Sequence, residues 1–208
     1  MPLVSSDTMV WSELNCLGLL AVLAIATAVV AALLFSIVRP SLSVWPSPRR
    51  DRPAWRARHV VHRVTGALVV LAGLGVLGLA LFDRGSLGLP IGPAQLVGAL
   101  LLAFGAVFGL WGYVRLGPAA SQGASVPLVS SGPYRYSRNP QYVGAIAVLL
   151  GFGLLCSSKL GLVAGATLSL WFLIAPFAEE PRLSEQLGPS YDDYLRSTPR
   201  FLGIPERR

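Results

Sequence analysis

Long apolar runs separated by short polar segments dominate the pattern of this chain. Three of them, 17–38, 64–82 and 91–114, contain no charged residue. A fourth, 143–178, is too long for one span, because about 20 helical residues cross a bilayer. The polar group at 156–159 divides it into 142–155, which is short for a full span, and 160–178. We predict five transmembrane helices, since backbone polar groups in lipid must be hydrogen-bonded within a helix.

The composition agrees with a membrane protein. Hydrophobic residues make up 53% of the 208 residues and charged residues 13%, whereas soluble domains carry about 25% charged residues. The net charge of +7 does not indicate nucleic acid as a partner, because the basic residues flank the apolar runs, where they set topology and contact membrane lipids. We predict an all-α fold, a polytopic membrane helical bundle forming a single membrane domain over 1–208.

The basic residues alternate between the two ends of the predicted bundle. Segment 39–63 holds seven arginines, 115–141 holds three and the tail after 178 holds five, whereas 83–90 holds one and 157–159 a single lysine. The positive-inside rule then places the N-terminus outside and the C-terminus in the cytoplasm. The first segment carries Asp7 and Glu13 but no basic residue, so we expect the first run to be a retained span and not a signal peptide.

Small residues and cysteines admit two interpretations each. Gly105, Gly109 and Gly112 share the third run, where they permit close helix packing or let a flat ligand lie against the helix. Cys16 and Cys156 both fall near the outer ends of spans, so a disulfide is geometrically allowed, although isolated apolar thiols are the favoured interpretation. No pattern typical of a metal site is present.

Two structured segments flank the last pair of predicted helices. The block GPYRYSRNPQYVG covers 132–144, and Pro140 in it suits the first position of the fourth helix. In the tail, Pro181 is expected to open a helix that ends at Gly188, and Ser190 to cap a second short one. The apolar face of that second helix consists of Tyr191, Tyr194 and Leu195. We predict a C-terminal interfacial helical lid over the bundle mouth.

These pieces together resemble the isoprenylcysteine carboxyl methyltransferase family. The likeness lies in Arg138-Asn139-Pro140-Gln141-Tyr142-Val143-Gly144, the pair Glu179-Glu180, Leu187-Gly188-x-x-Tyr191-x-x-Tyr194 and Pro199-Arg200-Phe201. It covers about 111–201, so 1–110 are expected to serve packing and 111–208 to form the cofactor-binding catalytic core. The family commonly has a histidine where this chain has Asn139. It also tends to have a proline two residues after the final phenylalanine, whereas in this chain the proline comes later, at Pro205. An asparagine there keeps hydrogen bonding but removes an imidazole base.

The resemblance implies a membrane methyltransferase that uses S-adenosylmethionine, grouped with the phospholipid N-methyltransferases. Arginine suits the cofactor's carboxylate as a bidentate fork, glutamate its ammonium or ribose diol, and tyrosines and glycines its adenine. The expected cofactor-binding residues are Tyr134, Arg138, Asn139, Pro140, Tyr142, Gly144, Glu179, Glu180, Tyr194 and Arg200. Glu180 and Arg138 are the expected catalytic residues. Neighbouring helical residues point about 100° apart, and we expect Glu180 to face the cofactor or acceptor and Glu179 to hold Arg138 or Arg200.

The acceptor and two rival functions stay open at this point. The acceptor is a lipophilic molecule, either the carboxylate of a prenylcysteine-like compound or a lipid amine, for which Glu180 would take the proton. Membrane sterol-type reductases share a similar arginine-proline block but use a nicotinamide, and a non-enzymatic scaffold or transporter is the third possibility. One lysine against sixteen arginines indicates a GC-rich bacterial genome, so we expect the bacterial cytoplasmic membrane.

Overall fold

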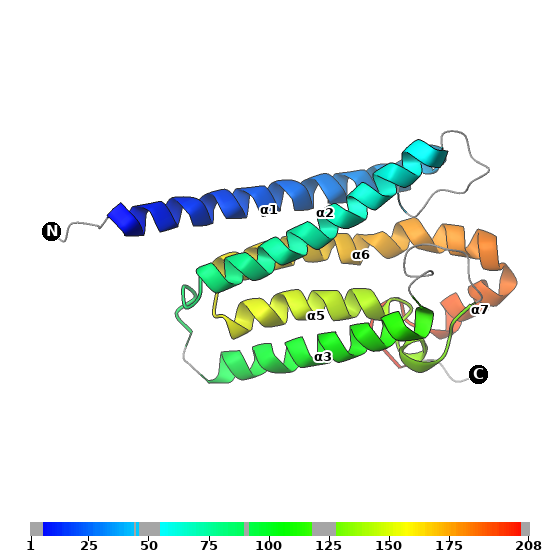
Figure 1. Ribbon diagram of the computed structural model, residues 1–208. Coiled ribbons are helices and arrows are strands. Elements are labelled where there is room, and N and C mark those ends of the chain that lie inside the picture. The colour runs from blue at the N-terminus through cyan, green and yellow to red at the C-terminus, as the bar shows by residue number, and fades with distance from the viewer. Residues whose placement is uncertain (1–5, 44, 46–54, 90–91, 118–127, 205–208) are drawn as a thin grey trace.

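The described part of the chain is helical throughout. The computed structural model describes residues 6–43, 45, 55–89, 92–117 and 128–204, and these residues contain no strand. The helices are α1 (Ser6–Val38), α2 (Trp55–Phe82), α3 (Pro93–Leu116), α5 (Pro140–Leu155), α6 (Lys159–Leu187) and α7 (Pro189–Ser197), with single 3-10 turns η1 (Pro40–Leu42) and η2 (Gly132–Arg135). Five long helices run alongside one another in alternating directions, and the short α7 lies across one end (Figure 1).

Within the described residues, four helices are long and apolar enough to cross a membrane by length and composition, namely α1, α2, α3 and α6. The fourth predicted helix, α5, has 16 residues and is about 24 Å long at 1.5 Å per residue, which is less than the roughly 30 Å of a hydrocarbon core. The predicted break between the last two spans is confirmed, because α5 ends at Leu155 and α6 begins at Lys159. Pro140 is the first residue of α5, as expected.

Glycines let α3 and α5 pack backbone against backbone. A Cβ built on Gly105 would lie 2.6 Å from the carbonyl oxygen of Gly144, and one on Gly112 would lie 2.9 Å from the Pro140 ring. Gly109 also contacts Gly144, with a built Cβ 3.3 Å from its Cα. The space beside these glycines is therefore occupied by the neighbouring helix, so the packing interpretation is confirmed and a flat ligand against this face of α3 is excluded.

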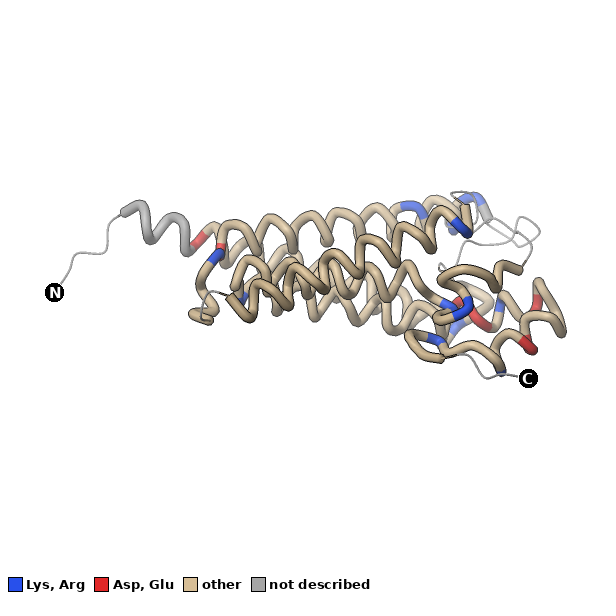
Figure 2. Tube along the Cα trace, turned by 90° about the horizontal axis from the view of Figure 1, so that it is seen from below, with Lys and Arg blue, Asp and Glu red and all other residues tan. Residues whose placement is uncertain are grey.

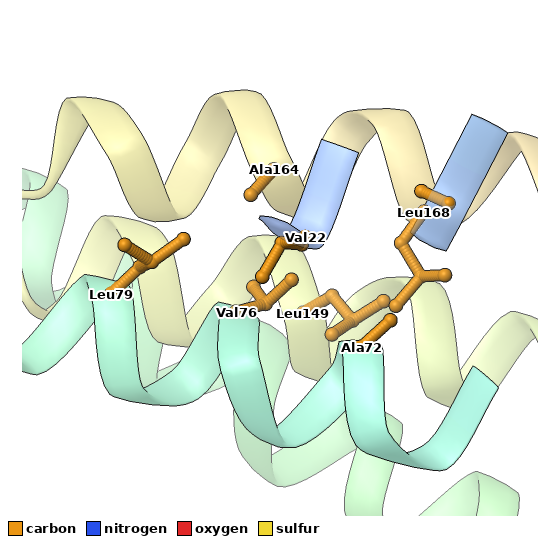
Figure 3. Close-up of a cluster of buried hydrophobic side chains, with 8 residues drawn as sticks. Val22, Ala72, Val76, Leu79, Leu149, Ala164 and Leu168 are labelled. Carbon is orange, nitrogen blue, oxygen red and sulfur yellow. The ribbon is translucent and has the colours of Figure 1, made fainter. Parts of the chain in front are cut away.

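The main core lies where α1, α2, α5 and α6 meet. Its side chains are buried, and several are alanines that allow the helices to approach closely. Figure 3 shows these side chains converging from the four helices: Val22, Ala72, Val76, Leu79, Leu149, Ala164 and Leu168. The two cysteines are free, with Cys156 buried and Cys16 exposed, so the allowed disulfide does not form.

The C-terminal helices differ from the sequence prediction at two points. Pro181 does not open a helix, because α6 continues through Pro176 and Pro181 to Leu187. A proline inside a helix costs about 3 kcal/mol. Hydrogen bonds of Glu179 and Glu180, just before Pro181, hold α6 on two sides and offset this cost. Gly188, with φ 62°, caps α7 in place of Ser190, whose hydroxyl instead donates to the carbonyl oxygen of Leu187.

Asp83, in the turn after α2, contacts the segment that joins α5 to α6. Its carboxylate accepts hydrogen bonds from the Ser158 hydroxyl and from the backbone N–H of Leu160, both at 2.8 Å, and from the Ser86 hydroxyl at 2.6 Å. Burial opposes the charged form, but these donors outweigh it and lower the pKa of Asp83. The turn after α2 is thereby tied to the first turn of α6.

Charged residues gather at the opposite end, beside α7. Figure 2 shows most of the coloured basic residues, with acidic residues among them, at this end of the Cα tube and few at the other. The basic segments that the sequence placed on one face therefore meet at one end of the bundle, where α6 ends and α5 begins.

Candidate functional site

A cluster of two arginines and one glutamate lies at the end of α6. Arg200 donates to Glu180 through Nε (2.9 Å) and a terminal nitrogen (2.7 Å), and a terminal nitrogen of Arg138 lies 3.3 Å from the same carboxylate. The side chains of Arg138 and Glu180 are only 10% and 11% exposed. Hydrogen bonding to Glu180 raises the pKa of Arg200. Arg138, Glu180 and Arg200 together form the arginine–glutamate cluster.

The tail reaches this cluster because it is bonded to the segment before α5. The Asn139 side chain donates to the backbone oxygen of Arg200 at 2.9 Å, and the backbone N–H of Arg138 donates to Pro199 at the same distance. Arg200 also covers the Phe177 ring, with its guanidinium carbon 4.1 Å from the ring centroid. Two motifs that lie about 60 residues apart thus form one unit, and Asn139 holds the tail in place.

Glu179 points away from the arginines and is held by aromatic residues. One of its oxygens, Oε1, accepts hydrogen bonds from the Tyr142 hydroxyl at 2.5 Å and from the Trp45 indole N–H at 2.6 Å. Its second oxygen, Oε2, has no hydrogen-bond donor among the described residues. The expectation that Glu179 holds Arg138 or Arg200 is therefore wrong, because Glu180 holds both. The rotation of α6 turns Glu180 toward the tail and Glu179 toward α5 and the α1–α2 connection.

Three tyrosines join α7 to η2. The Tyr194 hydroxyl donates to the backbone oxygen of Tyr134 at 2.6 Å, and Gln141 donates to the Tyr134 hydroxyl at 3.1 Å. Tyr134, Tyr191 and Tyr194 are all buried, and burial raises the pKa of Tyr134 to about 12. The phenols therefore stay neutral and fix α7 over the bundle end.

The structure brings together only some of the predicted site residues. Those around the end of α6 are Arg138, Asn139, Tyr142, Glu179, Glu180 and Arg200. Tyr134 and Tyr194 belong to the tyrosine cluster. Pro140 and Gly144 pack against α3, and a Cβ built on Gly144 would lie 2.6 Å from the Gly105 oxygen. The side of Gly144 that faces α3 therefore has no room for a cofactor.

Sequence reasoning missed Trp45. It lies 134 residues from Glu179 in the chain, in a proline- and serine-rich segment where a tryptophan is typical of a membrane interface. No local pattern could have indicated its partner.

Two groups of the site have hydrogen-bonding capacity that the described residues do not use. Nε of Arg138 is buried and has no acceptor among the described residues, although buried donors are nearly always satisfied. Together with Oε2 of Glu179, it provides one donor and one acceptor at the end of α6.

Comparison with known proteins agrees with this picture. Residues 93–190 match the family model described as phospholipid methyltransferase. A stretch of 81 residues is 35% identical to the nickel-cobalt-cadmium resistance protein NccN of Alcaligenes xylosoxydans xylosoxydans, covering 38% of this chain and 37% of that protein. The chain thus spans little more than a third of the length of that relative. No solved structure matches the chain. The resemblance seen in the sequence is confirmed by this match: residues 93–190 are similar to the phospholipid methyltransferase family, which belongs to the group of membrane methyltransferases that includes the isoprenylcysteine carboxyl methyltransferases.

Proposed function

We propose that this protein is an integral membrane methyltransferase that uses S-adenosylmethionine to methylate a lipophilic acceptor. The observation that carries the proposal is the buried, unsatisfied Nε of Arg138 at the polar end of an apolar bundle, within the family-matched residues. A guanidinium in this state is suited to an anionic ligand, because the ligand would supply the missing acceptor and a charge-assisted hydrogen bond.

The residues present fit the cofactor's polar groups. Arg138 would hold the carboxylate, and the open oxygen of Glu179 would hold the ammonium. When bound, the cofactor supplies an electrophilic methyl group. Methyl transfer needs alignment and exclusion of water more than an elaborate catalytic group. The chain's part is therefore to orient the cofactor at the end of α6 and to keep the acceptor's reacting atom in an apolar surrounding.

Glu180 has a supporting role in this proposal. Both of its oxygens already accept hydrogen bonds from Arg200, so it fixes the two guanidinium groups and does not need to take a proton. A carboxylate acceptor needs no base, whereas the proton of a lipid amine would pass to water or to Glu179 at the polar end of the bundle. We place this end in the cytoplasm, because the arginine-rich segments meet there.

Equilibrium binding of labelled S-adenosylmethionine to the purified protein tests the proposal. Arg138→Ala should weaken binding by about ten- to a hundredfold, because a hydrogen bond to a charged group contributes about 1.5–3 kcal/mol. Arg138→Lys should recover little, since the fork geometry is lost. Arg135→Ala is the matched control, because Arg135 is exposed and lies three residues away. Equal dissociation constants for all variants would mean that Arg138 only anchors topology.

The chemistry of the methylated product distinguishes a carboxylate acceptor from an amine acceptor. Membranes incubated with cofactor labelled in its methyl group are extracted, and the labelled lipids are treated with base. Loss of the label as methanol identifies a methyl ester, whereas stable label on an amine identifies N-methylation. Absence of any transfer, or a thermal shift with a nicotinamide in place of S-adenosylmethionine, would contradict the proposal.

A further inference from the structure

Trp45 contacts the candidate site from a part of the chain that the family match does not include. The match begins at residue 93, and Trp45 lies between α1 and α2. Its indole N–H nevertheless donates to Glu179 at 2.6 Å. The first two helices therefore have a direct connection to the site in addition to their packing.

Trp45 is held by contacts with three helices, of its backbone with α1 and of its ring with α2 and α6. Its backbone N–H donates to the Ser36 hydroxyl of α1 at 3.2 Å, and its carbonyl accepts from the Ser43 hydroxyl at 2.6 Å. The ring stacks on His62 of α2 with centroids 4.4 Å apart, and its edge meets Trp171 of α6 at 4.9 Å. A ring held in this way can direct its N–H at one point only.

Two donors from different parts of the chain therefore determine how Glu179 is oriented. Tyr142 on α5 and Trp45 both bond to Oε1. With that oxygen engaged twice, rotation of the carboxylate is restricted and Oε2 keeps one direction. An acidic group with one fixed, open oxygen is suited to a cationic ligand group such as an ammonium.

We propose that Trp45 is a positioning residue of the site: through it the α1–α2 hairpin orients Glu179 toward an ammonium group. This inference rests on the proposed function, which provides two sources of such a group, the cofactor and an amine acceptor. It also gives the N-terminal helices a part in ligand binding that the family-matched segment alone would lack.

The test compares Trp45→Phe with Trp171→Phe. Both tryptophans belong to the same aromatic cluster, but the buried Nε1 of Trp171 has no acceptor among the described residues. Each change removes an indole and keeps an aromatic ring, whereas only the first removes a hydrogen bond to Glu179. Replacing Trp45 with 3-benzothienylalanine, which keeps the bicyclic shape without the N–H, separates the hydrogen bond from packing.

The expected result is an effect of about tenfold, as for loss of one hydrogen bond to a charged group. If the ammonium is the cofactor's, Trp45→Phe and the benzothienyl variant raise the dissociation constant of S-adenosylmethionine about tenfold. If it is the acceptor's, they raise the acceptor KM by that factor while cofactor binding stays constant. In either case kcat changes little, and Trp171→Phe, which keeps the hydrogen bond between Trp45 and Glu179, has a much smaller effect on binding than Trp45→Phe.

A double-mutant cycle with Glu179→Gln completes the test. If Trp45 acts through Glu179, Trp45→Phe has little further effect on binding once Glu179 is replaced. Additive effects, or equal binding constants for Trp45→Phe and Trp171→Phe in a protein whose wild type binds the cofactor, overturn this inference alone. A wild type that does not bind S-adenosylmethionine overturns the proposed function first, and the inference with it.

Discussion

Glu180→Gln should destabilise the protein substantially, because it removes the charge that neutralises two arginines. The side chains of Arg138 and Glu180 are 10% and 11% exposed, and Nε of Arg138 already lacks an acceptor. Removing one partner of a buried ion pair costs about 3–5 kcal/mol. Since the glutamine oxygen still accepts one hydrogen bond, the lower end applies, about 3 kcal/mol. For a chain of this size, 1 kcal/mol moves the unfolding temperature by about 2–4 °C, so the expected decrease is about 6–12 °C.

Thermal unfolding in detergent can be followed with a thiol-reactive dye. Cys156 is buried and Cys16 is exposed, so a Cys16→Ser background leaves one thiol that reacts on unfolding. The control is Asp193→Asn, because the Asp193–Arg196 pair is more than half exposed and such pairs contribute less than about 1 kcal/mol. An unfolding temperature for Glu180→Gln within about 2 °C of the wild type would refute the reasoning and make the cluster no stronger than a surface ion pair.

Two further stability changes follow from the helix contacts, measured with the same dye. Gly144→Ala should lower the free energy of unfolding by about 1–3 kcal/mol, as overpacking does, because the new Cβ would lie 2.6 Å from the α3 backbone. The control is Gly73→Ala, which should be neutral or stabilising because its new Cβ has nothing within 4 Å. Equal effects of the two substitutions would contradict the packing. Asp83→Asn should lower the free energy of unfolding by up to about 1 kcal/mol at neutral pH, as loss of a helix cap does. Solvent exposure of Asp83 reduces this effect. Because the folded pKa of Asp83 is lowered, its contribution is present above the ordinary carboxyl pKa and disappears as the pH falls through the folded value. The unfolding temperatures of wild type and variant should therefore converge in acid, and a constant difference would contradict this assignment.

The sequence by itself determined the helices and which of their ends meet. Hydrophobic runs long enough for a bilayer fixed α1, α2, α3 and α6, and the polar group at 156–159 placed the break before Lys159. Arginine-rich segments alternate with the spans, which put the block before Pro140 and the tail at one end of the bundle. These properties depend on transfer of residues between water and lipid and on local backbone chemistry, so they can be inferred from residue order alone.

The tertiary structure alone decided which side chains became partners. Adjacency in sequence predicts that Glu179 and Glu180 diverge by about 100°, but only the rotation of α6 within the bundle decides which of them meets the arginines. The same packing carries α6 through Pro181, fills the glycine face of α3 with α5 and brings Trp45 to Glu179 across 134 residues. Each outcome depends on how helices distant in sequence press against one another, and a pattern within one helix contains no information about the neighbour it will contact.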